Sequence, residues 1–370
     1  MNQNQPQLPK GICVLETQVA GHLFTNNTAA LGMLKDETIG CVLKPFGKPE
    51  CGARELSFYE NLQQTNDPLL KKLQNFIPKF YKKIRLEVNG KEHTFFQLED
   101  LTHGMQRPCI MDIKVGKRTW DPLASPHKCK VEEEKYARCK QVLGICLPGF
   151  QVYTAEGYQK YDRDYGKKLD ADGLRAALRM FLNGQERVCE ALIEELLRQL
   201  YDIREWFREQ KYFHFYASSL LIAYDFVALQ KRLQTTTGTT TTNGQQQQQR
   251  EKCTACQKSK QQQQQHQNHQ QQHDGHHHHI PNGNSLHICE VADNYDNDDD
   301  YVDGYHPSAP PRLATKEVNN QCCCTCLERY VKVKMIDFAH VFPATNNSLD
   351  MNYLFGLESL IVILEDMLQR

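Results

Sequence analysis

Runs of single residue types dominate the chain between residues 234 and 326 and limit what it can fold into. This stretch contains a threonine run, two glutamine runs, a histidine run and an aspartate run. Such a composition buries too little apolar surface to offset the entropy lost on ordering, so we expect the stretch to be disordered. Strand-like sequence lies on both sides of it. The stretch is therefore predicted to be an insertion within a domain and not a linker between domains.

The rest of the chain is long enough for a sizeable core. Its 370 residues leave room for two domains or for one large two-lobed domain, and 40% of them are hydrophobic. The formal net charge is −1. A nearly neutral chain has no overall field that attracts nucleic acid or an anionic membrane, so no nucleic-acid partner is expected. A strongly anionic ligand would have to be bound by a local cluster of Lys and Arg.

The first ten residues are polar and are predicted to form a flexible tail. They lack the apolar segment of a secretory signal, and no run of 18 or more apolar residues predicts a transmembrane helix. Fifteen cysteines are spread unevenly along the chain. Without a secretory signal, these are expected to be reduced and mostly buried thiols in a cytosolic or nuclear protein.

Residues 11–102 show the pattern of a small sheet with one helix. Residues 38–44 read as a strand, and residues 53–63 have the apolar spacing of a helix. Two further strands, 84–88 and 93–98, flank Asn89-Gly90, which suits the type I′ turn of a β-hairpin. We therefore predict an N-terminal, nucleotide-binding lobe over 11–102.

Residues 103–370, with the insertion inside them, are predicted to form a larger C-terminal lobe. Strands are expected at 111–115, within 212–226 and at 331–336. Helices are expected at 170–182 and 184–210, and a largely buried helix at 354–368. The predicted fold class is α+β, with two lobes.

The segment from Pro108 to Gly116, PCIMDIKVG, carries the chemistry. In a strand, alternate side chains share a face, so Asp112 and Lys114 would project together while their neighbours enter the core. Gly116 would continue the polar face and leave space for a ligand near the backbone. A carboxylate and an ammonium on one rigid strand suit phosphoryl transfer, because one can hold hydroxyls or metal while the other neutralises charge. From spacing alone, a surface ion pair is an equally good interpretation.

The whole segment resembles the PxxxDxKxG signature of the inositol polyphosphate kinase family. Further family blocks occur in the same order: residues 18–22 (QVAGH), 219–221 (SLL) and 336–338 (IDF). This resemblance covers nearly the whole chain outside the tail and the insertion. It implies a two-lobed fold distantly related to protein kinases, an ATP-dependent phosphotransferase activity, and Mg²⁺ as cofactor with ATP as co-substrate.

The resemblance also implies roles for single residues around ATP. Lys44 would contact its phosphates, the backbone at Glu99 and Leu101 would bind adenine, and Asp112 would hold the ribose. Asp337 would bind the metal, as the metal-binding aspartate of protein kinases does, with Ser219 at the same site. Without the family pattern, Lys44 would be taken for a solvated strand edge and Ser219 for an ordinary satisfied hydroxyl.

Three residues are implied to bind the inositol phosphate: Lys114, Lys128 and His340. Lys114 would lie beside the reacting phosphate and the attacking hydroxyl, and Lys114 and Asp112 are the implied catalytic residues. Other cations close to Lys128 are left unassigned, because the acidic run 132–134 among them is equally typical of a solvated helix face.

Within the family, the chain resembles the multikinase branch, on Trp120-Asp-Pro and on the insertion between the SLL and IDF blocks. That branch implies phosphorylation of inositol tris- and tetrakisphosphate to pentakisphosphate, a phosphatidylinositol 4,5-bisphosphate activity at the membrane surface, and residence in nucleus and cytoplasm. A trisphosphate 3-kinase, a hexakisphosphate kinase and a catalytically silent scaffold remain alternatives. The chain has neither GxGxxG nor HRDxxxxN, which argues against a protein substrate.

Overall fold

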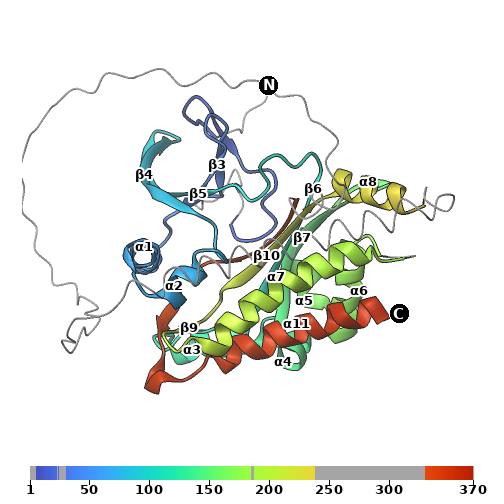
Figure 1. The fold of residues 1–370 in the computed structure, drawn as a ribbon. Coiled ribbons are helices and arrows are strands. Elements are labelled where there is room, and N and C mark those ends of the chain that lie inside the picture. The colour runs from blue at the N-terminus through green and yellow to red at the C-terminus, as the bar shows by residue number, and fades with distance from the viewer. Residues whose placement is uncertain (1–5, 23, 25–30, 185–186, 238–329, 370) are drawn as a thin grey trace, which may run out of the picture. The chain divides into compact units, whose positions relative to one another are not determined.

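The computed structural model describes residues 6–22, 24, 31–184, 187–237 and 330–369. Apart from Thr237, these residues belong to one compact unit (Figure 1). Helix α8 (Phe226–Thr237) includes the first residues of the predicted insertion, 234–237. The remainder of the predicted insertion, residues 238–326, lies outside the described residues, as do residues 1–5 of the predicted tail.

The first sheet has five antiparallel strands in the order β1-β2-β3-β5-β4. The predicted hairpin is confirmed, and Asn89 and Gly90 have φ values of 54° and 73° as a type I′ turn requires. The predicted strand at 38–44 begins only at residue 41, because a turn occupies residues 37–40. The strand bounds are β1 (Ile12–Val14), β2 (Leu34–Asp36), β3 (Cys41–Pro45), β4 (Phe80–Val88) and β5 (Lys91–Glu99).

Two helices, α1 (Pro49–Gln64) and α2 (Pro68–Leu73), lie between β3 and β4. The predicted helix at 53–63 is confirmed within α1. Phe58 of α1 stacks on Phe338 with ring centroids 4.5 Å apart, and Tyr59 stacks on Phe80 at 5.0 Å. Since Phe80 belongs to the first sheet and Phe338 follows the last strand of the second, α1 packs against both parts of the chain.

The second sheet is also antiparallel, in the order β11-β10-β6-β7-β8. Ser219 lies opposite Lys114 on one side and Ile336 on the other, and Leu221 lies opposite Asp112. These residues therefore share one face. The bounds are β6 (Pro108–Val115), β7 (Ile145–Thr154), β8 (Gly157–Tyr161), β10 (Ser219–Asp225) and β11 (Val331–Ile336), while β9 (Phe213–Phe215) pairs with β12 (Val341–Pro343).

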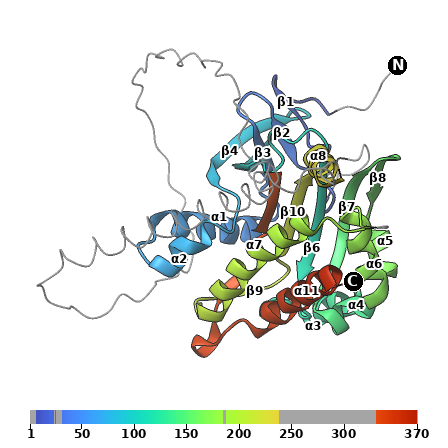
Figure 2. The same ribbon diagram turned by 45° about the vertical axis from the view of Figure 1, so that its right-hand side comes forward.

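Helices cover the opposite face of the second sheet (Figures 1 and 2). Met111, Ile113 and Val115 of β6 are buried there, as predicted. The ring of Phe207 in α7 stacks on Tyr353 of α11 with centroids 4.2 Å apart. The helices of this part are α3 (Pro126–Glu134), α4 (Ala137–Leu143), α5 (Arg163–Lys168), α6 (Ala171–Phe181), α7 (Glu190–Glu209) and α11 (Met351–Gln369), with a short 3₁₀ helix, η1 (Thr345–Asn347), before α11.

Helix boundaries differ from the predicted ones where turns and caps intervene. Asn183 has a φ of 54° and ends the helix predicted at 170–182, but α7 begins at residue 190 and not at 184. The last helix begins at residue 351, three residues earlier than expected, because Asp350 accepts the N–H of Tyr353 and that of Phe215. Among the described residues, no helix has the length and apolarity to cross a bilayer.

Candidate active site

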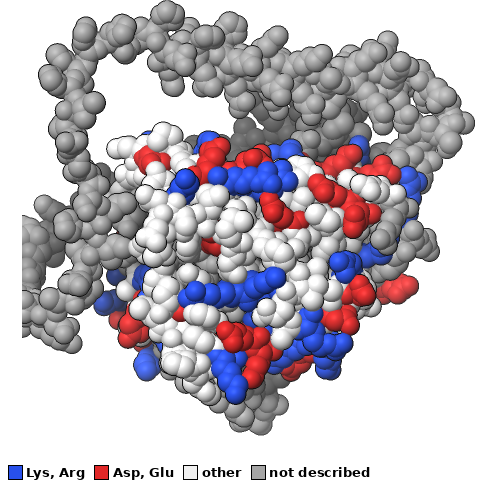
Figure 3. Space-filling view, turned by 90° about the horizontal axis from the view of Figure 1, so that it is seen from below, with Lys and Arg blue, Asp and Glu red and all other residues white. Residues whose placement is uncertain are grey.

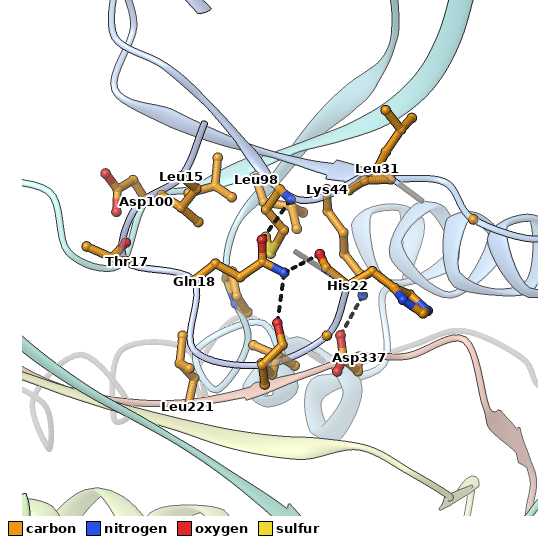
Figure 4. A pocket seen from close by; sticks show the side chains of 18 of the residues that line it. Leu15, Thr17, Gln18, His22, Leu31, Lys44, Leu98, Asp100, Leu221 and Asp337 are labelled. Atoms are coloured by element: carbon orange, nitrogen blue, oxygen red, sulfur yellow. Dashed lines mark hydrogen bonds and ion pairs between the residues drawn. The ribbon is translucent and has the colours of Figure 1, made fainter. Parts of the chain in front are cut away.

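A cavity of about 760 Å³ lies between the two sheets (Figure 4). Small-molecule sites in proteins usually have volumes of this order. Lys44 of β3 contributes from the first sheet, and Asp112 of β6, Leu221 of β10 and the residue after β11, Asp337, contribute from the second. The end of β5 and the chain just after it, residues 99–102, line one side.

Lys44 joins the two sheets inside this cavity. Its ammonium donates hydrogen bonds to Glu55 of α1 at 2.7 and 3.0 Å and to Asp337 at 2.7 Å. Burial alone would lower the pKa of Lys44, but Asp337 and Glu55 outweigh it and raise that pKa. Glu55 also accepts the N–H of Phe338 at 3.2 Å. A strand lysine paired with a helix glutamate is the arrangement that holds ATP phosphates in protein kinases.

Asp337 has a strained backbone. Its φ of 65° lies in the left-handed region, which costs a residue with a Cβ about 1–2 kcal/mol. The hydroxyl of Ser218 donates to the Asp337 carbonyl at 2.7 Å and supports this conformation. The carboxylate faces the cavity with 41% of the side chain exposed. The cavity walls around it partly remove water from this carboxylate, which alone would raise the pKa of Asp337, but Lys44 and Lys114 outweigh that effect and lower the pKa.

Asp112 and Ser219 lie on the cavity side of the second sheet and are both buried. Asp112 is only 5% exposed. Burial, together with the negative charge of Asp337, raises the pKa of Asp112 to about 6. One oxygen of Asp112 and the hydroxyl of Ser219 make no hydrogen bond of good geometry among the described residues, although Ser219 lies close enough to Asp112 to lower its pKa. Buried polar atoms are rarely left unpaired, so these two atoms indicate a place for ligand groups.

Lys114 is half-buried, and its ammonium donates to the carbonyl of Ala217 at 2.7 Å. Its charge lowers the pKa values of Asp112 and Asp337, so it lies within electrostatic reach of both. The sequence interpretation of Gly116 was wrong. Its φ is 104°, and the space next to its Cα is filled by the side chain of Asn352, so a packing requirement and not ligand access explains this glycine.

A second group of polar side chains surrounds His340. The Nδ1 atom of His340 lies 2.5 Å from Asp121. Arg54 of α1 donates to the neighbouring Ala339 carbonyl at 2.7 Å, and the charges of Lys128 and Arg54 both act on His340. Burial lowers the pKa of His340 despite its contact with Asp121. For Asp121, burial alone would raise the pKa, but the hydrogen bond from His340 and the Leu123 N–H lower it. A neutral imidazole of His340 that donates a hydrogen bond to an ionised Asp121 carboxylate is consistent with the lowered pKa values of both residues.

The segment 18–22 covers part of the cavity (Figure 4). The amide of Gln18 donates to the carbonyls of Ala20 at 2.8 Å and His22 at 2.9 Å, and its oxygen accepts the N–H of Met33 at 2.9 Å. Val19 packs with Ile110 and Ala223 of the second sheet. A Cβ on Gly149 would collide with the Val19 carbonyl, so this glycine lets the segment approach the sheet.

The structure brings most of the predicted site residues together. Lys44, Glu99, Leu101, Asp112 and Asp337 line the cavity. Lys114 and Ser219 lie beside it on the same sheet face. The other two predicted residues are His340 and Lys128. Both belong to the group around His340, where Lys128 is exposed on α3. Their chemical roles stay predictions.

Three residues at the site were not predicted from the sequence: Glu55, Arg54 and Asp121. For Glu55 a signal was present. It lies on the apolar face of α1, four residues before Tyr59 and seven before Leu62, and all three are buried. A glutamate in such a stripe requires a charged partner. For Asp121 the sequence offered only a Trp-Asp-Pro tripeptide, with no local sign of its contact to a residue more than two hundred positions away.

Comparison with known proteins identifies the family. A model of the inositol polyphosphate kinase family matches residues 95–365, which is more than half of the chain. The chain belongs to the inositol polyphosphate kinase family. Its fold is α+β as predicted, and as a family member it is an ATP-dependent inositol phosphate kinase.

Individual members of the family show where the similarity is extensive. The inositol polyphosphate multikinase of Mus musculus is 26% identical over 381 residues, which cover 98% of this chain and 94% of the relative. The inositol hexakisphosphate kinase 3 of Mus musculus is 36% identical over 138 residues, covering 36% and 35%. The structure of an inositol phosphate multikinase from S. cerevisiae, in complex with ADP and Mn²⁺, aligns with a TM-score of 0.52 at 17% identity, over 89% of this chain and 99% of that one. This last likeness concerns the fold.

Proposed function

We propose that this kinase is a multikinase, which transfers the γ-phosphate of ATP to hydroxyls of inositol tris- and tetrakisphosphate to give the pentakisphosphate. We also propose phosphatidylinositol 4,5-bisphosphate as a substrate met at the membrane surface, and nucleus and cytoplasm as the locations. Similarity to the mouse multikinase along nearly the whole chain supports the branch. The contact of Lys44 with Asp337 in one cavity, beside Asp112, is the observation that carries the chemistry.

The cavity suits a nucleotide. In the proposed arrangement, the backbone at Glu99 and Leu101 binds adenine, Asp112 accepts a hydrogen bond from the ribose, and Lys44 holds the phosphates. All four residues line the cavity. Glu55 fixes the ammonium of Lys44, so the charge that receives the phosphates is already oriented before ATP binds.

The site also fits Mg²⁺. The half-exposed carboxylate of Asp337 and the hydroxyl of Ser219 would hold the ion, and Ser219 lies opposite the residue that precedes Asp337. The described residues contain no cluster of three or more His, Cys, Asp or Glu that could hold a metal alone. Mg²⁺ in kinases needs only one or two carboxylates, because substrate phosphates complete its shell. When bound, the ion supplies positive charge to the phosphoryl group in transfer.

The protein's own part in phosphoryl transfer is positioning and charge stabilisation. Lys114 is proposed to neutralise the transferred group, since it already lies within electrostatic reach of Asp112 and Asp337. His340, oriented by Asp121, and Lys128 are proposed to bind the inositol phosphate. On the face in Figure 3, basic and acidic side chains are interspersed and form no large basic surface. The positive charge that binds the phosphates must therefore come from a few residues at the site.

A transfer assay tests this function. The protein is incubated with γ-labelled ATP, Mg²⁺ and, separately, inositol trisphosphate, inositol hexakisphosphate, or vesicles that contain phosphatidylinositol 4,5-bisphosphate. We expect sequential products up to pentakisphosphate, label in the lipid, and loss of all transfer in Lys114→Ala. Labelling of hexakisphosphate alone would assign the protein to that branch, and no transfer by the wild type would favour a silent scaffold.

A further inference from the structure

Helix α3, which carries Lys128, has an unusual mode of attachment. The helix lies wholly within the described residues, and none of its side chains is fully buried, although Cys129, Val131 and Glu132 are half-buried. A helix of nine residues is too short to be stable alone and normally relies on an apolar face packed against the core. With so little apolar burial, polar contacts contribute much of what holds α3 in place.

At its N-terminus, α3 is capped by Ser125, whose hydroxyl accepts the N–H of Lys128 at 3.3 Å. Near its C-terminus, the side chain of Glu133 accepts the indole N–H of Trp120 at 3.2 Å. Both partners belong to the loop before α3, the same loop that contains Asp121. These contacts hold α3 to its loop but not to the core.

The connection to the core is made by Lys140. This residue lies on the buried face of α4, with Cys139 and Leu143, and is only 1% exposed. Its ammonium donates a hydrogen bond to the main-chain carbonyl of Glu132 and lies 3.5 Å from the hydroxyl of Thr119. Thr119 is buried too, and its hydroxyl lies 3.4 Å from the Glu132 carboxylate.

Physical chemistry favours this contact strongly. The carbonyl of Glu132 belongs to the last turn of α3, whose carbonyls have no partner within the helix. An ammonium at the C-terminal end of a helix also interacts favourably with the helix dipole. A buried ammonium without partners is very costly. Separation of α3 from Lys140 would leave the ammonium in that state, so the contact stabilises both groups.

We propose that Lys140 is a positioning residue for the inositol phosphate: it anchors α3 to the core so that Lys128 is held beside His340 and Asp121. This inference rests on the proposed binding of inositol phosphate by Lys128. It assigns to Lys140 no contact with either substrate. Loss of the anchor should therefore affect binding of the inositol phosphate and leave the nucleotide cavity unchanged.

The first experiment measures the anchor without any substrate. Millisecond hydrogen exchange is followed in residues 126–134 of the full-length protein. In Lys140→Met, which keeps the length of the side chain, exchange should be roughly three- to tenfold faster, the effect of one lost hydrogen bond. The matched control, Gln141→Met, changes the exposed neighbour on α4 and should match the wild type. Unchanged exchange in Lys140→Met would overturn the anchor.

The second experiment measures its consequence in steady-state kinetics. Lys140→Met should raise KM for inositol trisphosphate by roughly three- to tenfold, with KM for ATP and the melting temperature close to wild type. Thr119→Val, a smaller change at the same contact, should act in the same direction. In a Lys128→Met background, Lys140→Met should add nothing. A rise in KM for both substrates, or a full effect that persists without Lys128, would show a general structural role and overturn the proposal.

The two experiments separate this inference from the proposed function. If Lys128→Met alone left KM for inositol trisphosphate unchanged, the proposed role of Lys128 would be wrong, and so would the link from Lys140 to the substrate. The exchange experiment would still decide independently whether Lys140 anchors α3.

Discussion

The ammonium of Lys44 lies 2.7 Å from the carboxylate of Asp337, although 293 positions separate them in the chain. Lys44 belongs to β3 of the first sheet, and Asp337 follows β11 of the second. Both residues line the cavity between the sheets, so their contact joins its two walls. It also places a cation for phosphates and a carboxylate for a metal within one small volume, which phosphoryl transfer requires.

Asp337→Asn should remove the metal-binding charge with little change in structure. Asparagine tolerates the left-handed backbone at this position, so the fold should persist. We expect kcat/KM to fall by roughly 10³, a loss typical of removing one electrostatic contact in a transition state. Steady-state kinetics at saturating Mg²⁺, with circular dichroism as the control for folding, provides the measurement. Activity within threefold of wild type would show that Asp337 does not bind the metal.

Glu55→Gln should test the orientation of Lys44. The substitution keeps the shape of the side chain but removes the charge that holds the ammonium from α1. We expect a 10- to 100-fold fall in kcat/KM for ATP, roughly 1.4–3 kcal/mol, because the lysine then has Asp337 as its only charged partner among those observed. Glu60→Gln, at an exposed position of the same helix, is the matched control. Equal kinetics for the two variants would refute this role of Glu55.

The raised pKa of Asp112 predicts a pH dependence of stability in the ligand-free protein. Its pKa is about 6 in the folded state against 3.8 in an unfolded chain. Between about pH 4 and pH 6, the folded protein therefore binds more protons at this residue than the unfolded chain does. Stability should then decrease as pH rises from about 4 to 6, by about 2–3 kcal/mol from this group. In Asp112→Asn, stability should not decrease over this pH range, so at pH 7 the variant should be more stable than the wild type. It should also be inactive. Denaturant unfolding at pH 4 and pH 7 measures the effect, and parallel profiles for both proteins would exclude it.

The sequence allowed the local structure and the face of each element to be predicted, and it failed where contacts are long-range. Alternation in β6 correctly separated Asp112 from the core residue Met111, and Asn89-Gly90 gave the hairpin its turn. No local pattern could show that Asp121 meets His340. Such pairs depend on the register of the whole sheet and on the path of the connecting loops.

From the sequence, one glycine, Gly116, was also misinterpreted, and one buried charged residue, Lys140, was overlooked. Gly116 was interpreted as access for a ligand, but the structure shows a positive φ and a close approach by Asn352. Lys140 was not singled out at all, because an isolated lysine near an acidic run is usually solvated. Only the packing of α4 reveals that it is buried.

Gln18→Ala should weaken ATP binding selectively. The side chain of Gln18 holds the 18–22 segment against the cavity through three hydrogen bonds to main-chain atoms. Their loss should free the segment and raise KM for ATP by about tenfold, which corresponds to a little over 1 kcal/mol. KM for inositol trisphosphate should change by less than twofold. The opposite selectivity would mean that this segment borders the second substrate and not the nucleotide.

The most direct test of the central claim is a crystal structure of the full chain with ADP and Mn²⁺, with the metal located by its anomalous scattering. We predict an anomalous peak at the carboxylate of Asp337 near Ser219, ADP phosphates beside Lys44, and adenine against the backbone of residues 99–101. A nucleotide or metal bound outside the cavity that Lys44, Asp112 and Asp337 share would contradict the account.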